Sequence, residues 1–303
     1  MGIRFMARTV EVIGARVGIG GRSLATADGP TAIRAAGLSR RIHHMRDLGD
    51  IVARPVVRAI GRDPGPAVIA EMQRYSLELR AAVEAILLRG SLPCILGGDH
   101  SIGAATQAAV ARVARGEGRS VPGLIWIDAH TDCNTMESTP SGNLHGMMLA
   151  AIHGLDVAAF REVVDGGLRD PARTVYLGAR DIDDEERLIV QRLGCRIITA
   201  EEVRTRGVHA MVALALEIAG GDDGRVSVSF DLDSLDPSIA PGVDCHVEGG
   251  FLWAEAQAIL TQIGLHPGIA AVEVVEVNPS ADIDQRTALL AVEAAALLCG
   301  RPV

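Results

Sequence analysis

The sequence lacks the features that would place it among disulfide-stabilised or nucleic-acid-binding proteins. No two cysteines form a CxxC pair, and the cysteines are odd in number and scattered, at Cys94, Cys133, Cys195, Cys245 and Cys299. This usage favours a reducing cytoplasm over a disulfide framework. Lys/Arg-rich runs are absent, and the formal net charge is -9. A surface for nucleic acid or for an anionic membrane is therefore not expected.

We also expect no signal peptide and no membrane anchor. The opening residues, MGIRFMARTVEVIGA, run into a strand-like segment without a charged head followed by a signal-type apolar stretch. The apolar run AAVEAILL is interrupted by Glu84 and is too short to cross a bilayer. We expect a soluble, cytoplasmic protein.

Nothing in the composition marks a boundary between domains. The chain shows no composition shift, low-complexity run or repeat. With 303 residues, 48% of them hydrophobic and 22% charged, it can bury one large core. We therefore expect a single domain over residues 1–303.

Short apolar runs alternate with longer helix-like segments along the chain. The runs that predict strands are VEVIGA from Val10, CILGG from Cys94, GLIWIDAH from Gly123, TVYLGAR from Thr174, CRIIT from Cys195, RVSVSFDLD from Arg225 and AAVEVVEVN from Ala270. Helical patterns include PAVIAEMQRYSLELRAAVEAILLRG and ADIDQRTALLAVEAAALLCG. This alternation is typical of parallel sheets covered by helices on both faces. We predict a three-layer α/β/α sandwich with a central, mostly parallel sheet.

Polar residues gather where four of these strands end. CILGG runs into His100, LIWI into Asp128, VSVSF into Asp231 and VEVV into Glu276. The carboxyl ends of parallel strands meet at one edge of a sheet, which is where ligands bind in such folds. These side chains are therefore expected to converge.

Two of the strand ends carry more than one acid or histidine. Asp128, His130 and Asp132 stand at alternate positions, as do Asp231 and Asp233. On an extended chain such residues point to the same side. Strand-end turns and helix caps are the alternative explanation for each stretch taken alone.

The conjunction of these residues favours a metal site. Four carboxylates and two imidazoles at one edge would repel and destabilise the fold unless cations neutralised them. Mixed oxygen and imidazole ligands suit borderline ions such as Mn, Fe or Co, whereas a structural zinc site prefers thiolates. Six ligands exceed what one ion with an open position needs, so a pair of ions is predicted.

Five motifs together resemble the arginase group of the ureohydrolases. They are GGDHS, DAHTDCNT, SGNLHGM, SFDLDSLDP and EVVEVNPS. The opening VIGA and DGPTAIRAAGL match as well, so the resemblance covers essentially the whole chain. It implies an arginase-like fold and a Mn-dependent amidinohydrolase that converts L-arginine and water to ornithine and urea. A regulatory homologue without turnover is the alternative from another class, but all six ligand positions are kept.

The resemblance also implies the roles of individual residues. One Mn ion would be held by His100, Asp128, Asp132 and Asp231, and the other by His130, Asp128, Asp231 and Asp233. A hydroxide between the ions would attack the guanidinium carbon. The remaining catalytic roles fall to Asp132, which would orient the hydroxide, to Glu276, which would pair with the guanidinium, and to His145, which would shuttle protons.

Substrate selection follows from a second group of positions. The residues matching Asn134, Ser141 and Asn143 receive the α-carboxylate in arginases, and the one matching Asp183 receives the α-amino group. Hydrolases of the agmatine type lack the SGN signature, so a small cationic guanidino substrate with an amino-acid end is favoured. The family commonly forms trimers or hexamers, and we expect a homotrimer or homohexamer.

The chain departs from the family in one loop. After DPSIAPG, where the family usually continues GTGTP, it reads VDCHVEGG. Asp244 replaces a glycine, Cys245 a threonine that lines the guanidinium end, and His246 a proline. Asp244 would strain or shift the loop if the backbone there were left-handed. Neutral drift, weakened activity and a modified substrate such as Nω-hydroxyarginine are the open explanations.

Overall fold

Eight parallel strands form the central sheet of the protein in a computed structural model, which describes residues 8–42, 44–57 and 63–299. Their order across the sheet is β2-β1-β3-β8-β7-β4-β5-β6. The strands are β1 (Val10–Arg16), β2 (Met45–Val52), β3 (Leu92–Gly97), β4 (Gly123–Ile127), β5 (Thr174–Leu177), β6 (Arg196–Ile198), β7 (Val226–Asp231) and β8 (Ile269–Val275).

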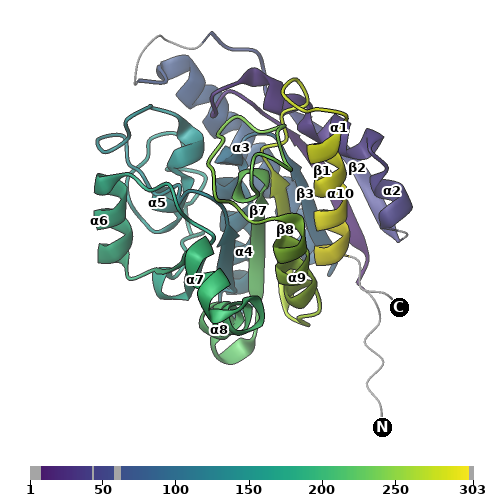
Figure 1. Cartoon of the computed structure of the whole chain (residues 1–303). Coiled ribbons are helices and arrows are strands. Elements are labelled where there is room, and N and C mark those ends of the chain that lie inside the picture. Colours follow the sequence, from purple (N-terminus) through teal and green to yellow (C-terminus); the bar gives the residue numbers. More distant parts are fainter. Residues whose placement is uncertain (1–7, 43, 58–62, 300–303) are drawn as a thin grey trace.

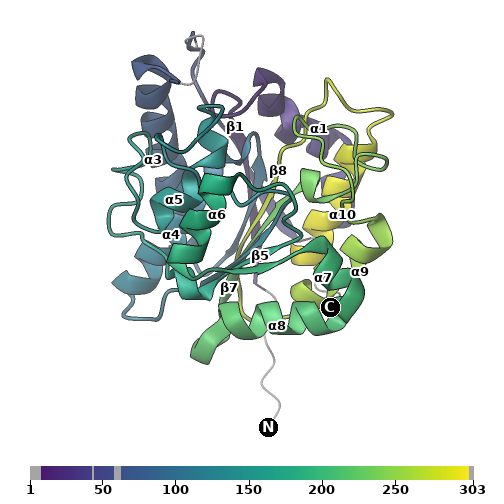
Figure 2. The ribbon, with the colours of Figure 1, turned by 60° about the vertical axis from the view of Figure 1, so that its left-hand side comes forward.

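Helices cover both faces of this sheet, which confirms the predicted three-layer sandwich (Figures 1 and 2). One face packs against α3 (Pro66–Leu88), α4 (Gly103–Gly116), α5 (Met148–Ile152) and α6 (Asp184–Leu193). The other packs against α1 (Gly29–Ala35), α2 (Leu38–Arg41), α7 (Ala200–Arg206), α8 (Val208–Gly220), α9 (Trp253–Gly264) and α10 (Arg286–Cys299). Because both faces are covered, the central strands are buried and read as continuous apolar runs.

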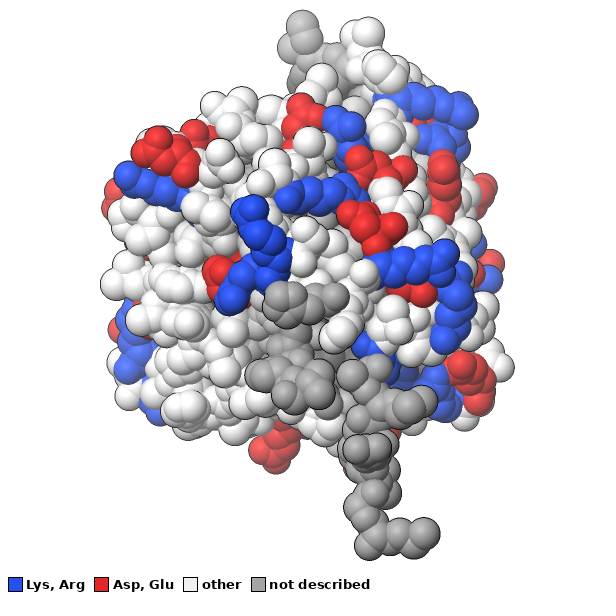
Figure 3. All heavy atoms as spheres, turned by 90° about the vertical axis from the view of Figure 1, so that its right-hand side faces the viewer, with Lys and Arg blue, Asp and Glu red and all other residues white. Residues whose placement is uncertain are grey.

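The seven strands predicted from apolar runs are all present, but an eighth was missed. Strand β2 lies at the edge of the sheet and most of its residues are exposed. Two of its carboxylates form ion pairs with Arg34 of α1, at 2.7 Å for Asp47 and 2.5 Å for Asp50. Acidic and basic side chains are interspersed over this side of the molecule (Figure 3). Such charges keep an exposed strand edge from pairing with another chain.

The strand order brings four carboxyl ends together in the middle of the sheet. Strands β3, β8, β7 and β4 are consecutive neighbours, although β7 and β8 come last in the chain. The chain therefore skips two positions in the sheet between β3 and β4, and β8 and β7 occupy these two positions. Crevices at such reversals of strand order are where parallel α/β folds bind ligands. No helix among the described residues is long and apolar enough to cross a membrane.

Candidate metal centre and active site

The ring of His100 is fixed on three sides beyond the end of β3. The chain reaches His100 through a tight turn at Gly98, which has no room for a side chain. A Cβ added to Gly98 would lie 2.0 Å from the backbone oxygen of Val17. The ring stacks on Trp126 of β4, with 3.9 Å between the centroids. Its Nε2 atom lies 2.8 Å from Oγ of Ser229 in β7. These contacts turn the Nδ1 atom towards the carboxyl edge of the sheet.

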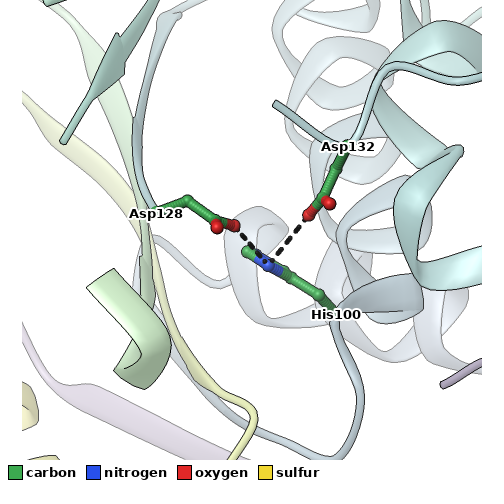
Figure 4. A group of neighbouring side chains, drawn as sticks. All are labelled: His100, Asp128 and Asp132. Carbon is green, nitrogen blue, oxygen red and sulfur yellow. Dashed lines mark ion pairs between the residues drawn. The ribbon is translucent and has the colours of Figure 1, made fainter. Parts of the chain in front are cut away.

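Three carboxylates surround that Nδ1 atom. It lies 3.0 Å from Oδ2 of Asp128, 3.3 Å from Oδ2 of Asp132 and 2.9 Å from Oδ2 of Asp231. Figure 4 shows the carboxylates of Asp128 and Asp132, both from the segment that follows β4, pointing at the ring from two sides. Neither Nδ1 nor Oδ2 of Asp128 has a partner with hydrogen-bond geometry, although both atoms are buried. Buried polar atoms that face one another without bonding fit a shared cation.

A second cluster lies beside the first and shares one of its carboxylates. The Nδ1 atom of His130 is 3.3 Å from Oδ1 of Asp128 and 3.2 Å from Oδ2 of Asp233. In each of the two groups His100–Asp128–Asp132 and Asp128–His130–Asp233, one ligand atom per residue lies within 4.8 Å of the others. Asp128 therefore faces both clusters, one oxygen to each.

The route by which these side chains converge differs from the alternation predicted for an extended chain. Strand β4 ends at Ile127, the next residues form a bend, and Asp132 has a φ of 47°. Asp233 lies in a short 3-10 helix, where its backbone N–H donates to Oδ1 of Asp231. Local turns, and not the pleat of the strands, aim the ligands. The left-handed backbone of Asp132 is strained for a residue with a Cβ, as is common at functional sites.

Burial and neighbouring charges shift the pKa values of the clustered carboxyl groups in opposite directions. Burial opposes ionisation of Asp128, but contacts with His100 and His130 hold its pKa well below its usual range. Burial raises the pKa of Asp132 to about 6, and the charge of Asp128 adds to the rise. Burial, with the charges of Asp233 and Asp128, also raises the pKa of Asp231. Burial and mutual repulsion disfavour the ionised forms of neighbouring carboxyl groups. A bound divalent cation stabilises these ionised forms.

Glu276 and His145 form a third group on the same edge. The Nδ1–H of His145 donates to Oε1 of Glu276 at 2.9 Å, and the backbone N–H of His100 donates to the same oxygen at 2.7 Å. Glu276 follows β8 with a φ of 67°, a second strained residue at this edge. Burial lowers the pKa of His145, but Glu276 outweighs it and raises the pKa to about 9.

The residues predicted to receive the amino-acid end lie in two facing loops. Asn134 is buried, and its Nδ2 donates to Oδ2 of the exposed Asp183 at 3.1 Å. Ser141 is exposed, and its Oγ accepts from the backbone N–H of Asn143 at 3.2 Å. The backbone N–H of Asn134 donates to the oxygen of Gly146, beside His145. Hydrogen bonds thus join Asn134 to Asp183 and to the segment that carries His145.

The loop that departs from the family is not strained at Asp244. Among the described non-glycine residues only Asp132, Glu276, Asp284 and Gln285 have positive φ. The carboxylate of Asp244 instead accepts from Nδ2 of Asn278 at 2.5 Å, which ties the loop to the segment after Glu276. Burial raises the pKa of the Cys245 thiol, and the nearby charges of Asp233 and Glu276 raise it further. His246 is exposed and bonds the oxygen of Pro241.

Two residues near the site were not singled out from the sequence. Glu186 is buried in the first turn of α6, and its Oε1 accepts from the backbone N–H of Cys133 at 2.7 Å. Arg180 bonds several backbone oxygens around Asp233. Both lie in the segment ARDIDDEE, residues 179–186, which also contains Asp183. The closeness of Arg180 and Glu186 to Asp183 in the sequence was the signal that could have pointed to them.

Comparison with known proteins identifies the family of the chain. The model of the Arginase family matches residues 8–300. The arginase of Bacillus subtilis is 34% identical over 302 residues, which cover 98% of this chain and 99% of the relative. A solved arginase structure from Bacillus caldovelox aligns with a TM-score of 0.86 and 32% identity, covering 98% of this chain and 99% of that one. A structure of the Entamoeba histolytica arginase in complex with L-ornithine aligns with a TM-score of 0.88 and 25% identity, covering 97% and 99%.

These similarities define a ureohydrolase, an enzyme that hydrolyses guanidino compounds. The chain belongs to the arginase family.

Proposed function

We propose that this protein hydrolyses L-arginine to ornithine and urea. The observation that carries the proposal is the convergence of two histidines and four carboxylates on one sheet edge, with Nδ1 of His100 facing three carboxylate oxygens and bonded to none. Relatives over essentially the full chain are arginases.

The proposed cofactor is a pair of Mn ions per chain. His100, Asp128, Asp132 and Asp231 would hold one ion, and His130, Asp128, Asp231 and Asp233 the other. Oxygen and imidazole donors without thiolate suit Mn, Fe and Co more than a structural zinc ion. When bound, such a pair supplies a hydroxide nucleophile near neutral pH.

The remaining catalytic residues handle the substrate and its protons. The buried carboxylate of Glu276 pairs with the planar guanidinium, for which it offers a charge-assisted hydrogen bond. Asp132 orients the attacking oxygen. The bond between the guanidinium carbon and the ornithine nitrogen then breaks, and that nitrogen takes a proton. His145, held by Glu276, delivers it.

The amino-acid end of arginine is bound by the two loops that carry Asn134 and Asp183. Asn134, Ser141 and Asn143 offer neutral hydrogen-bonding groups to the α-carboxylate, and Asp183 offers an acid to the α-ammonium. Asp181, Asp183, Asp184 and Glu185 are all exposed on the segment that follows β5. A group of exposed acidic side chains of this kind raises the local concentration of a cationic substrate.

Two coarser features of the protein are also proposed. We propose a homotrimer or homohexamer, on the family resemblance. We also propose a cytoplasmic location, to which the five free cysteines are suited.

Metal analysis together with urea release tests the proposed function. Chelator-stripped protein reconstituted with Mn is expected to hold about two ions per chain and to release urea from L-arginine. Asp128→Asn, which removes the carboxylate shared by the two clusters, should lose both properties, whereas Asp170→Asn at an exposed helix cap should keep them. One ion per chain would reject the two-ion site. Two ions without urea would favour a regulatory homologue.

A further inference from the structure

Arg180 connects three segments of the active site through backbone oxygens. It follows β5, and its Nη2–H groups donate to the oxygens of Asp233 and Val247, each at 2.8 Å. Its Nη1 donates to Ser234 at 3.2 Å, and its Nε donates to Glu248 at 3.2 Å. One side chain therefore holds the 3-10 turn that carries Asp233 and the end of the loop that carries Cys245.

The backbone of Arg180 reaches the remaining half of the same cluster. Its N–H donates to the oxygen of Ala129 at 2.8 Å, and Ala129 lies between Asp128 and His130. The N–H of Ala129 in turn donates to Oδ1 of Asp233 at 3.3 Å. Every residue of the Asp128–His130–Asp233 group is thus tied to Arg180 directly or through one neighbour.

The chemistry of these contacts requires a guanidinium. Backbone oxygens accept the hydrogen bonds of the Arg180 guanidinium, and the nearby charges of Asp233 and Asp128 favour its charged form. Arginine presents five N–H donors in a rigid planar fork, and here they bond backbone oxygens in two separate segments at once, around Asp233 and around Val247. A lysine ammonium has three donors at one point and cannot span the same set. Burial lowers the pKa of Arg180, and it stays charged at neutral pH.

We propose that Arg180 is a positioning residue that sets Asp233 for the ion on the His130 side and fixes the distance of the Cys245 loop from the guanidinium end of the substrate. The proposal rests on the proposed function, because it assigns separate ions to the two clusters. Groups behind metal ligands commonly control metal affinity by fixing ligand orientation.

Replacement of Arg180 tests this role through metal binding as well as turnover. For Arg180→Met we expect the affinity for the second Mn ion to fall at least about tenfold, the usual effect of losing a group that orients a ligand. The first ion, on His100, should stay bound. The EPR signal of paired Mn ions should give way to that of isolated ions at Mn concentrations that saturate the unmodified protein. KM for arginine should rise as the Cys245 loop moves. The Mn affinity and the KM of Arg180→Lys should lie between those of Arg180→Met and those of the unmodified protein.

Arg173 provides a matched control. Its guanidinium also spans backbone oxygens, of Ala219, Gly220 and Val121, but at the amino ends of the strands. Arg173→Met should lower the melting temperature and leave the Mn stoichiometry, the EPR signal and KM unchanged.

Three outcomes can be told apart. A second-ion defect in both Arg180 variants and not in Arg173→Met supports the positioning role. Identical behaviour of Arg180→Lys and Arg173→Met, with only thermal stability affected, overturns it, even if Arg180→Met does not fold. An unmodified protein that binds no pair of ions or releases no urea contradicts the proposed function itself, whatever the variants do.

Discussion

His145 and Glu276 share a hydrogen bond of 2.9 Å although they are 131 residues apart in the chain. The same Glu276 oxygen accepts from the backbone of His100, so it connects the proposed proton shuttle to the proposed metal cluster. A carboxylate in this position keeps the imidazole charged at neutral pH, because the charged form of the histidine gains a buried partner.

The first prediction concerns the pKa of His145 in metal-free protein. Its value of about 9 depends on the carboxylate, since burial alone would lower it. Glu276→Gln should therefore bring the pKa down by more than one unit, as measured by NMR titration of the imidazole. A pKa that stays near 9 in this variant would show that another charge controls His145.

The same pair makes stability depend on pH. The pKa of His145 is raised on folding from the ordinary 6.5 to about 9, so its stabilising contribution is complete below 6.5 and is lost as pH rises through about 9. The free energy of unfolding of metal-free protein should fall across that range. Glu276→Gln should flatten the fall.

The second prediction concerns Glu186, whose pKa burial raises from 4.5 to about 7. Here the folded state holds the proton more tightly than the unfolded state, so stability decreases from pH 4.5 to about 7 and then stays level. Glu186→Gln keeps an oxygen for the Cys133 N–H and does not titrate. Above pH 8 it should stabilise the protein by up to about 3 kcal/mol, at 1.36 kcal/mol per unit of pKa.

The measurement is urea denaturation at pH 5 and pH 8.5. At pH 5 the difference in stability between the variant and the unmodified protein should be much smaller than at pH 8.5. Glu185→Gln, on the exposed side of the same helix turn, is the control and should change neither value. A destabilised Glu186→Gln at pH 8.5 would mean that the Glu186 charge is stabilising.

The third prediction is that removal of metal lowers thermal stability. Like charges at the sheet edge are unscreened without cations, and an ion that binds only the folded state stabilises it by about 2.7 kcal/mol at a concentration of 100 Kd. Calorimetry with increasing Mn should show the melting temperature rising by several degrees. Asp128→Asn should abolish the rise, because Asp128 faces both clusters. A rise of the same size in that variant would place the ions elsewhere.

The fourth prediction separates the two ends of the amino-acid group. Asp183→Ala should lower kcat/KM at least about tenfold for arginine and agmatine, which carry the amino group, because a charge-assisted hydrogen bond contributes about 1.5–3 kcal/mol. It should leave guanidinobutyrate unaffected. Asn143→Ala should do the opposite, affecting arginine and guanidinobutyrate but not agmatine. Equal losses for all three compounds in either variant would contradict the assigned contacts.

Much of the fold and the position of the site could be predicted because parallel strands share a carboxyl edge. Apolar runs predict the buried strands, and the acids that follow them must then meet. Strand β2 escaped prediction because an edge strand needs no apolar run, and MRDLGDIV is mostly exposed. The left-handed backbone of Asp132 and Glu276 was equally hidden, since neither is a glycine.

The role of Arg180 lies beyond any local pattern. Its partners Asp233 and Val247 are 53 and 67 residues away, and it bonds their backbone oxygens, which every residue has. Side chains that recognise backbone leave no mark on the sequence of their partners. Such contacts appear only once the chain is folded.

The specificity of turnover tests the central claim most directly. The measurement compares kcat/KM for arginine, Nω-hydroxyarginine, agmatine and guanidinobutyrate on Mn-loaded protein, with urea or hydroxyurea as the product. A site that bonds both ends of the α-amino acid group rejects ligands that lack one of them, since its polar atoms are then left unpaired. Arginine should come first, by at least about tenfold over agmatine and guanidinobutyrate, since one lost charge-assisted hydrogen bond is enough for such a ratio. Hydroxyarginine in first place would assign the Asp244–Cys245 loop to a modified substrate. Agmatine or guanidinobutyrate in first place would contradict the account.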